Sequence, residues 1–511
     1  MLINIDSKVI VRPLKNFWNH IHFHPTDAIE DQWGKNILDR VASDGVAQYV
    51  RIYTMFEDIV SRGQNGNLVY DFTLNDKRID YMVEKGFKLL ICFNFMPPAI
   101  AKDPDKLSNM ARYKGKRINF SEPEDYRDWQ EIVYTYVKHI VTRYGLDTVS
   151  NWYLHCWNEP DWHYWLNDEN KNYTEDKVNA YIKLYDHFAA GILRVTDRIR
   201  FGGPSAAVHD SFIEAFIRHT KEGTNTVTGV IGTRIDFISI HTYSMRPSDF
   251  SKGMYPSVDR LFKRTEEIFE IMKRYGYDQK EIIVDEWGAT SGGLTNWDTV
   301  PEVVYRDNEY HPAFFAKLVH DYILRLEERK IPVSMMMICL CGQHNLVKDF
   351  EGGRSFFTLN LFPKPIYNVY ALLSKLGDQL LNYEMSDING NLGVIPTCDE
   401  EGNIKIFIFY MDENPKEQLK NLKVKLQIKE LQGSYSVMHY RIDHTSSNSF
   451  TKWLELGMPE NPNQLQRETI NNAGKLSFYY PEEVFENCTE YVEDIIMSGN
   501  SVSMIELNKR K

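Results

Sequence analysis

The sequence predicts a (β/α)8 barrel followed by a β-sandwich domain, and three observations support this fold. From about residue 16 to residue 345, eight short apolar runs alternate with segments whose apolar residues recur every three or four positions. Several of these runs are apolar throughout, as expected for strands that are buried on both faces. After about residue 365 the pattern changes to short alternating strands bounded by turn residues, which is typical of a sandwich.

The eight apolar runs are the expected barrel strands, because a strand followed by a helix, repeated eight times, makes a closed parallel barrel. The expected strands comprise residues 16–22, 49–53, 88–93, 152–157, 200–203, 237–241, 282–286 and 333–339. The clearest helices between them are expected at residues 75–84, 123–143, 175–194, 258–274 and 312–328. An open doubly wound sheet is the alternative, but no G-x-G-x-x-G turn follows the first strand.

The second domain is expected to begin near Pro363 and Pro365, which mark a joint in the chain. A helix is expected at residues 366–376, and strands at residues 392–396, 404–410, 422–428, 434–440, 475–480 and 501–505. The strand-like residues 2–11 are expected to fold back onto this domain, because chain termini often lie close together. We therefore predict a barrel domain over residues 13–365 and an accessory β-sandwich over residues 1–12 plus 366–511.

The composition of the chain limits which binding partners and which cellular compartment we expect. The 511 residues carry a formal net charge of -12 and no long Lys/Arg cluster, so we expect no nucleic-acid partner and no anionic-membrane partner. No apolar run is long enough to span a bilayer. The first residues lack the features of a signal peptide. We therefore expect a cytoplasmic protein, or a periplasmic or secreted one whose signal has been removed.

The six cysteines show no zinc-type spacing. Cys339 and Cys341 form a C-x-C pair within an apolar stretch. We interpret them as small buried hydrophobic residues, with a soft-metal pair as the alternative.

The first chemical signal is Glu159, which follows the fourth expected strand within the sequence WNEPD. Active-site groups of such barrels lie at the C-terminal ends of the strands, where the loops begin. Pro160 blocks further strand pairing and sets the exit of the chain. Asn158, next to the acid, can hydrogen-bond a sugar hydroxyl.

The second signal is Glu286, which ends the seventh expected strand within the sequence EIIVDEWG. Strands four and seven lie across from each other in a closed barrel, so Glu159 and Glu286 can flank one bond. Glycoside hydrolysis requires such a pair, one carboxyl as acid and the other as nucleophile or base. A separation of about 5–5.5 Å gives retention of configuration, and about 6.5–9.5 Å gives inversion.

These motifs resemble glycoside hydrolase family 39, the β-xylosidase and α-L-iduronidase family within the clan of retaining (β/α)8 glycosidases. The resemblance covers nearly the whole chain. It is carried by Tyr49-Val50-Arg51, DIVSRGQNGNLVY at residues 58–70, NFMP at 94–97, WNEPD at 157–161, SIHTY at 239–243 and WLELGMPENP at 453–462. It implies a retaining exo-glycosidase that works by double displacement, most simply a β-xylosidase-like enzyme that releases a terminal pentose from an oligosaccharide or polysaccharide.

The resemblance also implies roles for single residues. Glu159 would be the general acid/base and Glu286 the nucleophile that forms a covalent glycosyl-enzyme. Arg51 and Tyr243 would hydrogen-bond Glu286. Asn158 would hold the 2-hydroxyl of the bound sugar.

Three further substrate contacts are predicted from position. His24 follows the first strand, His241 ends the sixth, and Trp287 adjoins Glu286. The alternative is a purely structural role, as a buried histidine for His24 and His241 and as a core residue for Trp287. No three histidines have zinc-site spacing, so we expect no metal and no cofactor. Association into a homo-oligomer stays open.

The chain departs from the xylosidase pattern in two places. Glu286 lies in Asp-Glu-Trp-Gly, and the stretch after strand eight carries Glu351 and Arg354 in a loop that resembles the family's Gly-Gly loop. Lys348 and Arg354 are candidates for recognising a substrate carboxylate. Action on an α-L-iduronide or on arabinose-containing glycans is therefore the alternative function. A catalytically inactive carbohydrate-binding relative is the alternative of a different class, and the presence of both glutamates argues against it.

Overall fold

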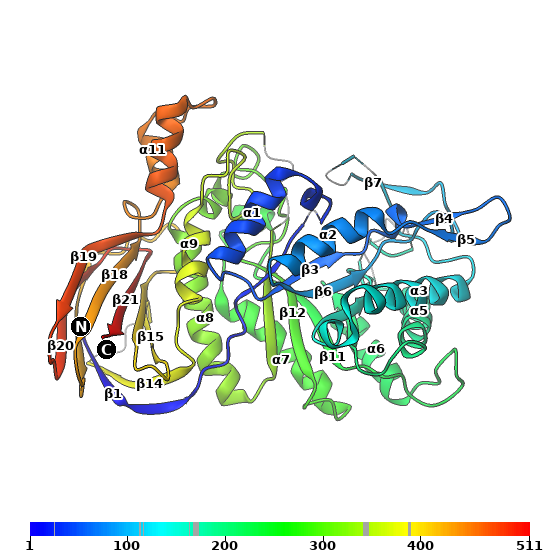
Figure 1. Cartoon of the computed structure of the whole chain (residues 1–511), viewed down its shortest axis with the longest axis horizontal. Helices are drawn as coiled ribbons and strands as arrows, with labels where there is room; N and C mark the ends of the chain where they lie inside the picture. Colours follow the sequence, from blue (N-terminus) through cyan, green and yellow to red (C-terminus); the bar gives the residue numbers. More distant parts are fainter. Residues whose placement is uncertain are drawn as a thin grey trace.

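The computed structural model describes residues 1–24, 26–111, 114–115, 117–162, 164–166, 173–340, 347–386 and 390–510. Its centre is a closed barrel of eight parallel strands, of which β3, β6, β11 and β12 are labelled in Figure 1. The order around the barrel is β10-β11-β12-β13-β2-β3-β6-β9. The strands are β2 (His20–His22), β3 (Tyr49–Tyr53), β6 (Lys88–Phe93), β9 (Tyr153–Cys156), β10 (Arg200–Ala206), β11 (Phe237–Tyr243), β12 (Glu281–Gly288) and β13 (Val333–Cys339). The predicted barrel is confirmed, and each predicted strand overlaps its observed counterpart.

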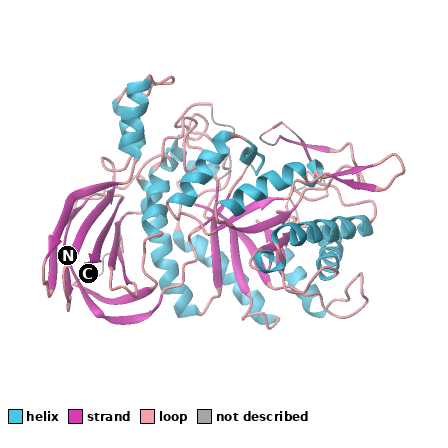
Figure 2. Ribbon diagram, in the orientation of Figure 1, coloured by secondary structure: helices cyan, strands magenta, loops and turns pink. Residues whose placement is uncertain are grey.

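Helices surround the barrel and cover its outer face (Figure 2). They are α1 (Gln32–Ser43), α2 (Thr73–Glu84), α3 (Tyr126–Tyr144), α4 (Leu146–Val149), α5 (Glu175–Leu193), α6 (Asp210–Glu222), α7 (Val258–Arg274) and α8 (Tyr310–Arg329). Shorter 3-10 helices are η1 (Thr26–Glu30), η2 (Phe56–Asp58), η3 (Pro247–Lys252) and η4 (Pro301–Arg306). Two small antiparallel pairs extend the loops, β4 (Val60–Arg62) with β5 (Leu68–Tyr70) and β7 (Leu107–Ala111) with β8 (Arg117–Asn119). The five helices predicted most clearly all occur, with shifts of a few residues at their ends.

Alternate residues of each strand point into the barrel, where they form two layers of side chains. The lower layer is a separate apolar cluster of Leu90, Tyr153, Phe237, Ile283, Met335 and Met337. Two residues further along the strands, the inward positions become polar. Arg51 and His155 are fully buried there. The apolar layer thus fills the barrel interior beneath a polar layer at the C-terminal ends of the strands.

The second domain is one nine-stranded sheet in the order β19-β18-β21-β16-β15-β14-β1-β17-β20. Its strands are β1 (Leu2–Pro13), β14 (Gln379–Met385), β15 (Leu392–Cys398), β16 (Ile404–Tyr410), β17 (Leu422–Lys429), β18 (Tyr435–Ile442), β19 (Ser477–Phe485), β20 (Glu490–Met497) and β21 (Ser501–Lys509). The sheet curls around one apolar core, so that His439 of β18 lies 2.7 Å from Glu493 of β20. This curl produces the two facing layers that the sequence predicts as a sandwich.

The N-terminal strand β1 pairs antiparallel with β14 and parallel with β17, so both chain ends contribute to this sheet (Figure 1). Helix α9 (Pro365–Leu373) is wholly buried and follows the barrel. Two further helices, α10 (Ser449–Glu455) and α11 (Gln464–Gly474), were not predicted, nor were β14 and β20. The domain limits at residues 12/13 and 365/366 remain predictions. In the part of the chain that the structure describes, no helix has the length and apolarity needed to cross a bilayer.

Candidate active site

The two predicted glutamates meet at the C-terminal mouth of the barrel. Glu286 lies on β12, and Glu159 lies in the loop directly after β9. Both are almost completely buried, with 6% and 8% of their surface exposed. A carboxylate oxygen of Glu159 lies within 4.8 Å of a carboxylate oxygen of Glu286. Two strands on different sides of the barrel therefore bring two acids to one point.

The loop that carries Glu159 has an unusual backbone. Trp157 and Glu159 have φ values of 66° and 48°, in the left-handed region that side chains other than glycine rarely adopt. The backbone N–H of Glu159 donates to the carbonyl of Ser205 on β10, at 3.1 Å. Such strain persists only where the surrounding structure imposes it, and it is concentrated at active sites.

Glu286 is surrounded by groups that stabilise its charge. Nη1 of Arg51 donates to Oε1 of Glu286 at 2.6 Å, and the hydroxyl of Tyr243 donates to Oε2 at 2.6 Å. Nδ1 of His22 lies 3.2 Å from Oε1. Burial alone raises the pKa of Glu286, but the charge of His241, the contact with His22 and the charge of Arg51 outweigh it. The pKa of Glu286 is held well below the usual range, so this carboxyl is ionised.

Glu159 is in the opposite state. Burial raises the pKa of Glu159, and the nearby negative charge of Glu286 raises it further, against the hydrogen bond from His241. That bond joins Nδ1 of His241 to Oε1 of Glu159 at 2.8 Å. Glu159 therefore retains a proton over a pH range in which Glu286 is charged, which is the division of roles that an acid and a nucleophile require.

His241 itself is held as a cation. Burial lowers the pKa of His241, but the charges of Glu286 and Asp285 outweigh burial and raise it to about 10. The fully buried guanidinium of Arg51 is the second cation of the site. These two positive charges offset the negative charges of Asp285 and Glu286 when Glu159 is neutral.

Asn158 lies beside these charges, but its carbonyl oxygen is already occupied. Nη2 of Arg51 donates to Oδ1 of Asn158 at 2.6 Å, and the hydroxyl of Tyr53 donates to the same atom at 3.2 Å. This arrangement orients the amide nitrogen as the group that can donate to a sugar hydroxyl.

One predicted substrate contact, Trp287, lies elsewhere than expected. Trp287 is fully buried and stacks on Phe315 of α8, with ring centroids 5.0 Å apart. Neighbouring residues of a strand point to opposite faces, so Trp287 points into the helical layer and offers no platform to a sugar. His24 is partly exposed and packs against Tyr53 and His22. The binding of a sugar hydroxyl by His24 stays a prediction, and the neighbouring His22 contacts Glu286.

Asp285, which is fully buried one residue before Glu286, was not predicted from the sequence. The pairing of β11 with β12 shifts between Ile240 and His241, so that Val284 and Glu286 have partners and Asp285 has none. This shift is a β-bulge, and it allows two successive side chains to reach the site. The adjacent acids of Asp-Glu were the only sequence signal for it.

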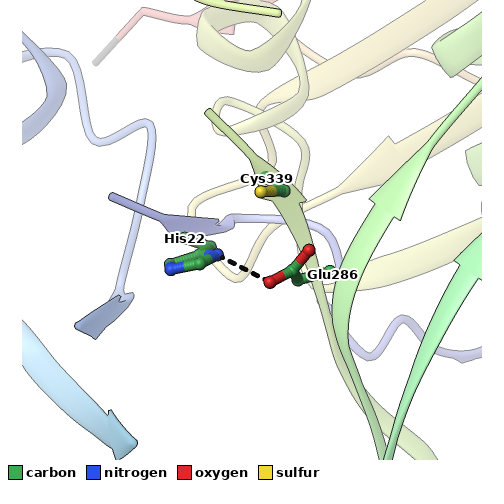
Figure 3. A group of neighbouring side chains, drawn as sticks. All are labelled: His22, Glu286 and Cys339. Atoms are coloured by element: carbon green, nitrogen blue, oxygen red, sulfur yellow. Dashed lines mark ion pairs between the residues drawn. The ribbon is translucent and has the colours of Figure 1, made fainter. Parts of the chain in front are cut away.

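Two groups of side chains at the site have atoms of the kind that bind metals. One is His22, Glu286 and Cys339, which Figure 3 shows converging from β2, β12 and β13. The other is Glu159, His241 and Glu286. Nη1 of Arg51 lies 2.6 Å from Oε1 of Glu286 and 2.9 Å from Nδ1 of His22, so a fixed positive charge already occupies the first group. The imidazolium of His241 occupies the second. The donor chemistry therefore fits an ion-pair network better than a resident cation. Cys341 lies outside the described residues.

Arg354, one of the two predicted carboxylate-binding candidates, packs against the ring of Tyr243. Its guanidinium carbon lies 4.9 Å from the centre of the Tyr243 ring, and the residue is 3% exposed. Gly288 makes this approach possible, because a Cβ there would lie 2.8 Å from Nη1 of Arg354. Lys348, the other candidate, forms an ion pair with Asp298 instead.

Comparison with known proteins identifies the family. The sequence model of the family described as glycosyl hydrolases family 39 matches residues 1–481. The chain belongs to glycosyl hydrolase family 39. The chain is therefore a glycoside hydrolase, the enzyme class that the two glutamates predicted.

Named members of family 39 resemble the chain over most of its length. A β-xylosidase of Caldicellulosiruptor saccharolyticus is 27% identical, over 99% of this chain and 98% of that protein. An α-L-iduronidase of Mus musculus is 23% identical, over 91% of this chain and 74% of that protein. The solved structure of a monomeric β-xylosidase from Caulobacter crescentus superposes with a TM-score of 0.81 at 20% identity, covering all of both chains. The structural match supports the two-domain fold.

Proposed function

We propose that this member of family 39 is a retaining, exo-acting glycosidase, in which Glu159 is the general acid/base and Glu286 the nucleophile. The observation that carries the proposal is the short separation of the two carboxyl groups. Oxygens within 4.8 Å of each other leave no room for the water molecule that an inverting enzyme holds between its basic carboxylate and the sugar. The opposite pKa shifts of the two groups supply the required protonation states.

The first step transfers the sugar to the protein. A carboxylate oxygen of Glu286 attacks the anomeric carbon, and the bond from that carbon to the glycosidic oxygen breaks. The proton of Glu159 moves to the departing oxygen, and the product is a glycosyl ester on Glu286.

The second step releases the sugar. Esterification removes the negative charge of Glu286, which had raised the pKa of Glu159, so Glu159 becomes better able to remain ionised. Its carboxylate accepts a proton from water while the water oxygen bonds to the anomeric carbon. The ester bond breaks, and the Glu286 carboxylate is regenerated.

For the substrate, we propose a terminal pentose in the β-xyloside configuration, on an oligosaccharide or polysaccharide. The supporting observation is the β-xylosidase of C. saccharolyticus, which aligns over nearly the full length of both proteins. A second candidate is an α-L-iduronide, favoured by the buried guanidinium of Arg354 beside Tyr243, since arginine binds carboxylates in a forked geometry.

Two variants test the assignment of roles on aryl glycosides. Glu286→Ala should abolish hydrolysis, and added azide should restore turnover to a glycosyl azide of inverted configuration. Glu159→Ala should keep activity on substrates with good leaving groups and lose it on natural linkages. Full activity of Glu286→Ala would refute the nucleophile assignment. A panel of aryl β-xyloside, α-L-arabinoside and α-L-iduronide would identify the sugar.

A further inference from the structure

Asp285 is a fully buried carboxylate of the site to which the proposed chemistry gives no role. Its Oδ2 accepts a short hydrogen bond from the hydroxyl of Ser205. The same oxygen lies 3.2 Å from Nε of Arg51 and 3.7 Å from Nε2 of His241. A buried carboxylate costs free energy unless it is paired, so these partners account for its presence.

His241 lies between two acids. Its Nδ1 faces Oε1 of Glu159 at 2.8 Å, and its Nε2 faces Oδ2 of Asp285 at 3.7 Å. A neutral imidazole has only one N–H, whereas an imidazolium has two and can direct one at each acid. The geometry therefore requires the charged form of His241 if both nitrogens are to face their acids favourably.

The contact with Glu159 determines where the acid's proton lies. When His241 is an imidazolium, its Nδ1–H donates to Oε1 of Glu159, and that oxygen acts as an acceptor. The proton of the neutral acid is then on the other oxygen, Oε2. If His241 were neutral with a bare Nδ1, the acid would instead donate its proton from Oε1 to the ring, away from a leaving group.

We propose that Asp285 is a positioning residue that keeps His241 as an imidazolium with Nδ1–H on Oε1 of Glu159, and so directs the acid proton to Oε2. This inference rests on the acid/base role proposed for Glu159. The β-bulge in β12 makes Asp285 available for this role, because the bulge turns both Asp285 and Glu286 toward the same site.

Other ionisable groups near His241 do not replace Asp285. The groups that face it directly are Glu159 after β9 and Asp285 and Glu286 on β12. Arg51 on β3, His155 on β9 and His22 on β2 lie behind these acids. Burial, followed by the charge of Arg51, lowers the pKa of both His155 and His22, so both are neutral. Of the three acids, only Asp285 faces Nε2, the nitrogen remote from Glu159.

The test is Asp285→Asn, compared with wild type on aryl glycosides of graded leaving-group ability. We expect kcat/KM to fall by about 10²-fold or more for poor leaving groups and far less for good ones, because general-acid catalysis contributes about 10²–10⁴-fold. The alkaline limb of the pH profile should move to higher pH, since a neutral His241 no longer lowers the proton affinity of Glu159. NMR of ¹⁵N-labelled histidine, assigned with His241→Gln, should show an imidazolium at position 241 in wild type and a neutral ring in Asp285→Asn.

Asp186→Asn is the matched control, because Asp186 is also fully buried and lies 3.0 Å from Nε2 of a histidine, His219, outside the active site. It should lower the melting temperature without changing the leaving-group dependence. An unchanged leaving-group dependence in Asp285→Asn, or a persistent imidazolium signal, would overturn the proposal. If wild type hydrolysed none of the aryl glycosides, the proposed function would fail instead, and the NMR measurement would still decide the state of His241.

Discussion

Arg51 and Glu286 form an almost completely buried ion pair inside the barrel, with Nη1 of the arginine 2.6 Å from Oε1 of the glutamate. The arginine comes from β3 and the glutamate from β12. Breaking a buried pair by removing one partner typically costs about 3–5 kcal/mol, because the other charge stays buried. The pair therefore links the stability of the barrel to the charge of Glu286.

We expect Arg51→Met to unfold at a lower temperature and to lose most of its kcat/KM. Without the guanidinium, the pKa of Glu286 rises and its carboxyl is less ionised at neutral pH. Calorimetry and steady-state kinetics would measure the two effects. Arg143→Met is the control, because Arg143 forms a largely exposed pair with Asp80, which contributes little. Equal losses in the two variants would contradict this prediction.

Tyr243→Phe tests the second donor to Glu286. A hydrogen bond to a charged group contributes about 1.5–3 kcal/mol, so kcat/KM should fall by roughly one to two powers of ten. Loss of a donor to the ionised form raises the pKa of Glu286. The acid limb of the kcat/KM profile should therefore move to higher pH. Tyr53→Phe removes a hydroxyl that bonds Asn158 instead, and it should leave the acid limb in place.

The raised pKa of His241 predicts how stability changes with pH. Its pKa is about 10 in the folded protein against 6.5 for an ordinary histidine, so folding binds a proton between these values. The stabilisation from His241 is fully present below pH 6.5 and is lost as the pH rises through 10. The difference in unfolding free energy between wild type and His241→Gln should accordingly shrink from pH 6.5 to pH 10. Urea titrations at several pH values would show a constant difference if His241 were not charged.

Gly288→Ala tests the role of the contact between Arg354 and Tyr243. The new methyl group would lie 2.8 Å from Nη1 of Arg354 and 3.1 Å from the Tyr243 ring, so one of them must move. We expect lower kcat/KM and a changed ratio of activities on xyloside and iduronide. Gly390→Ala is the control, because a Cβ there meets nothing within 4 Å and its backbone φ is not in the left-handed region. Unchanged substrate ratios in Gly288→Ala would show that Arg354 does not shape the sugar pocket.

Local patterns in the sequence determine the barrel, the sheet-rich second domain and the two glutamates. Strands buried on both faces are recognisable as short apolar runs, and catalytic groups follow their C-terminal ends. The strands β14 and β20 were missed, because the alternation of β14 is weak and β20 mixes acidic with apolar residues.

Only the tertiary structure decides which side chains meet around those glutamates. Strand alternation turns Trp287 into the helical layer, whereas a bulge turns Asp285 inward, and no property of a single residue distinguishes these outcomes. Residues far apart in the chain, such as Arg51 and Glu286, become neighbours only when the barrel closes. The charges of the site follow from that closure, because a pKa depends on burial and on the groups within a few ångströms.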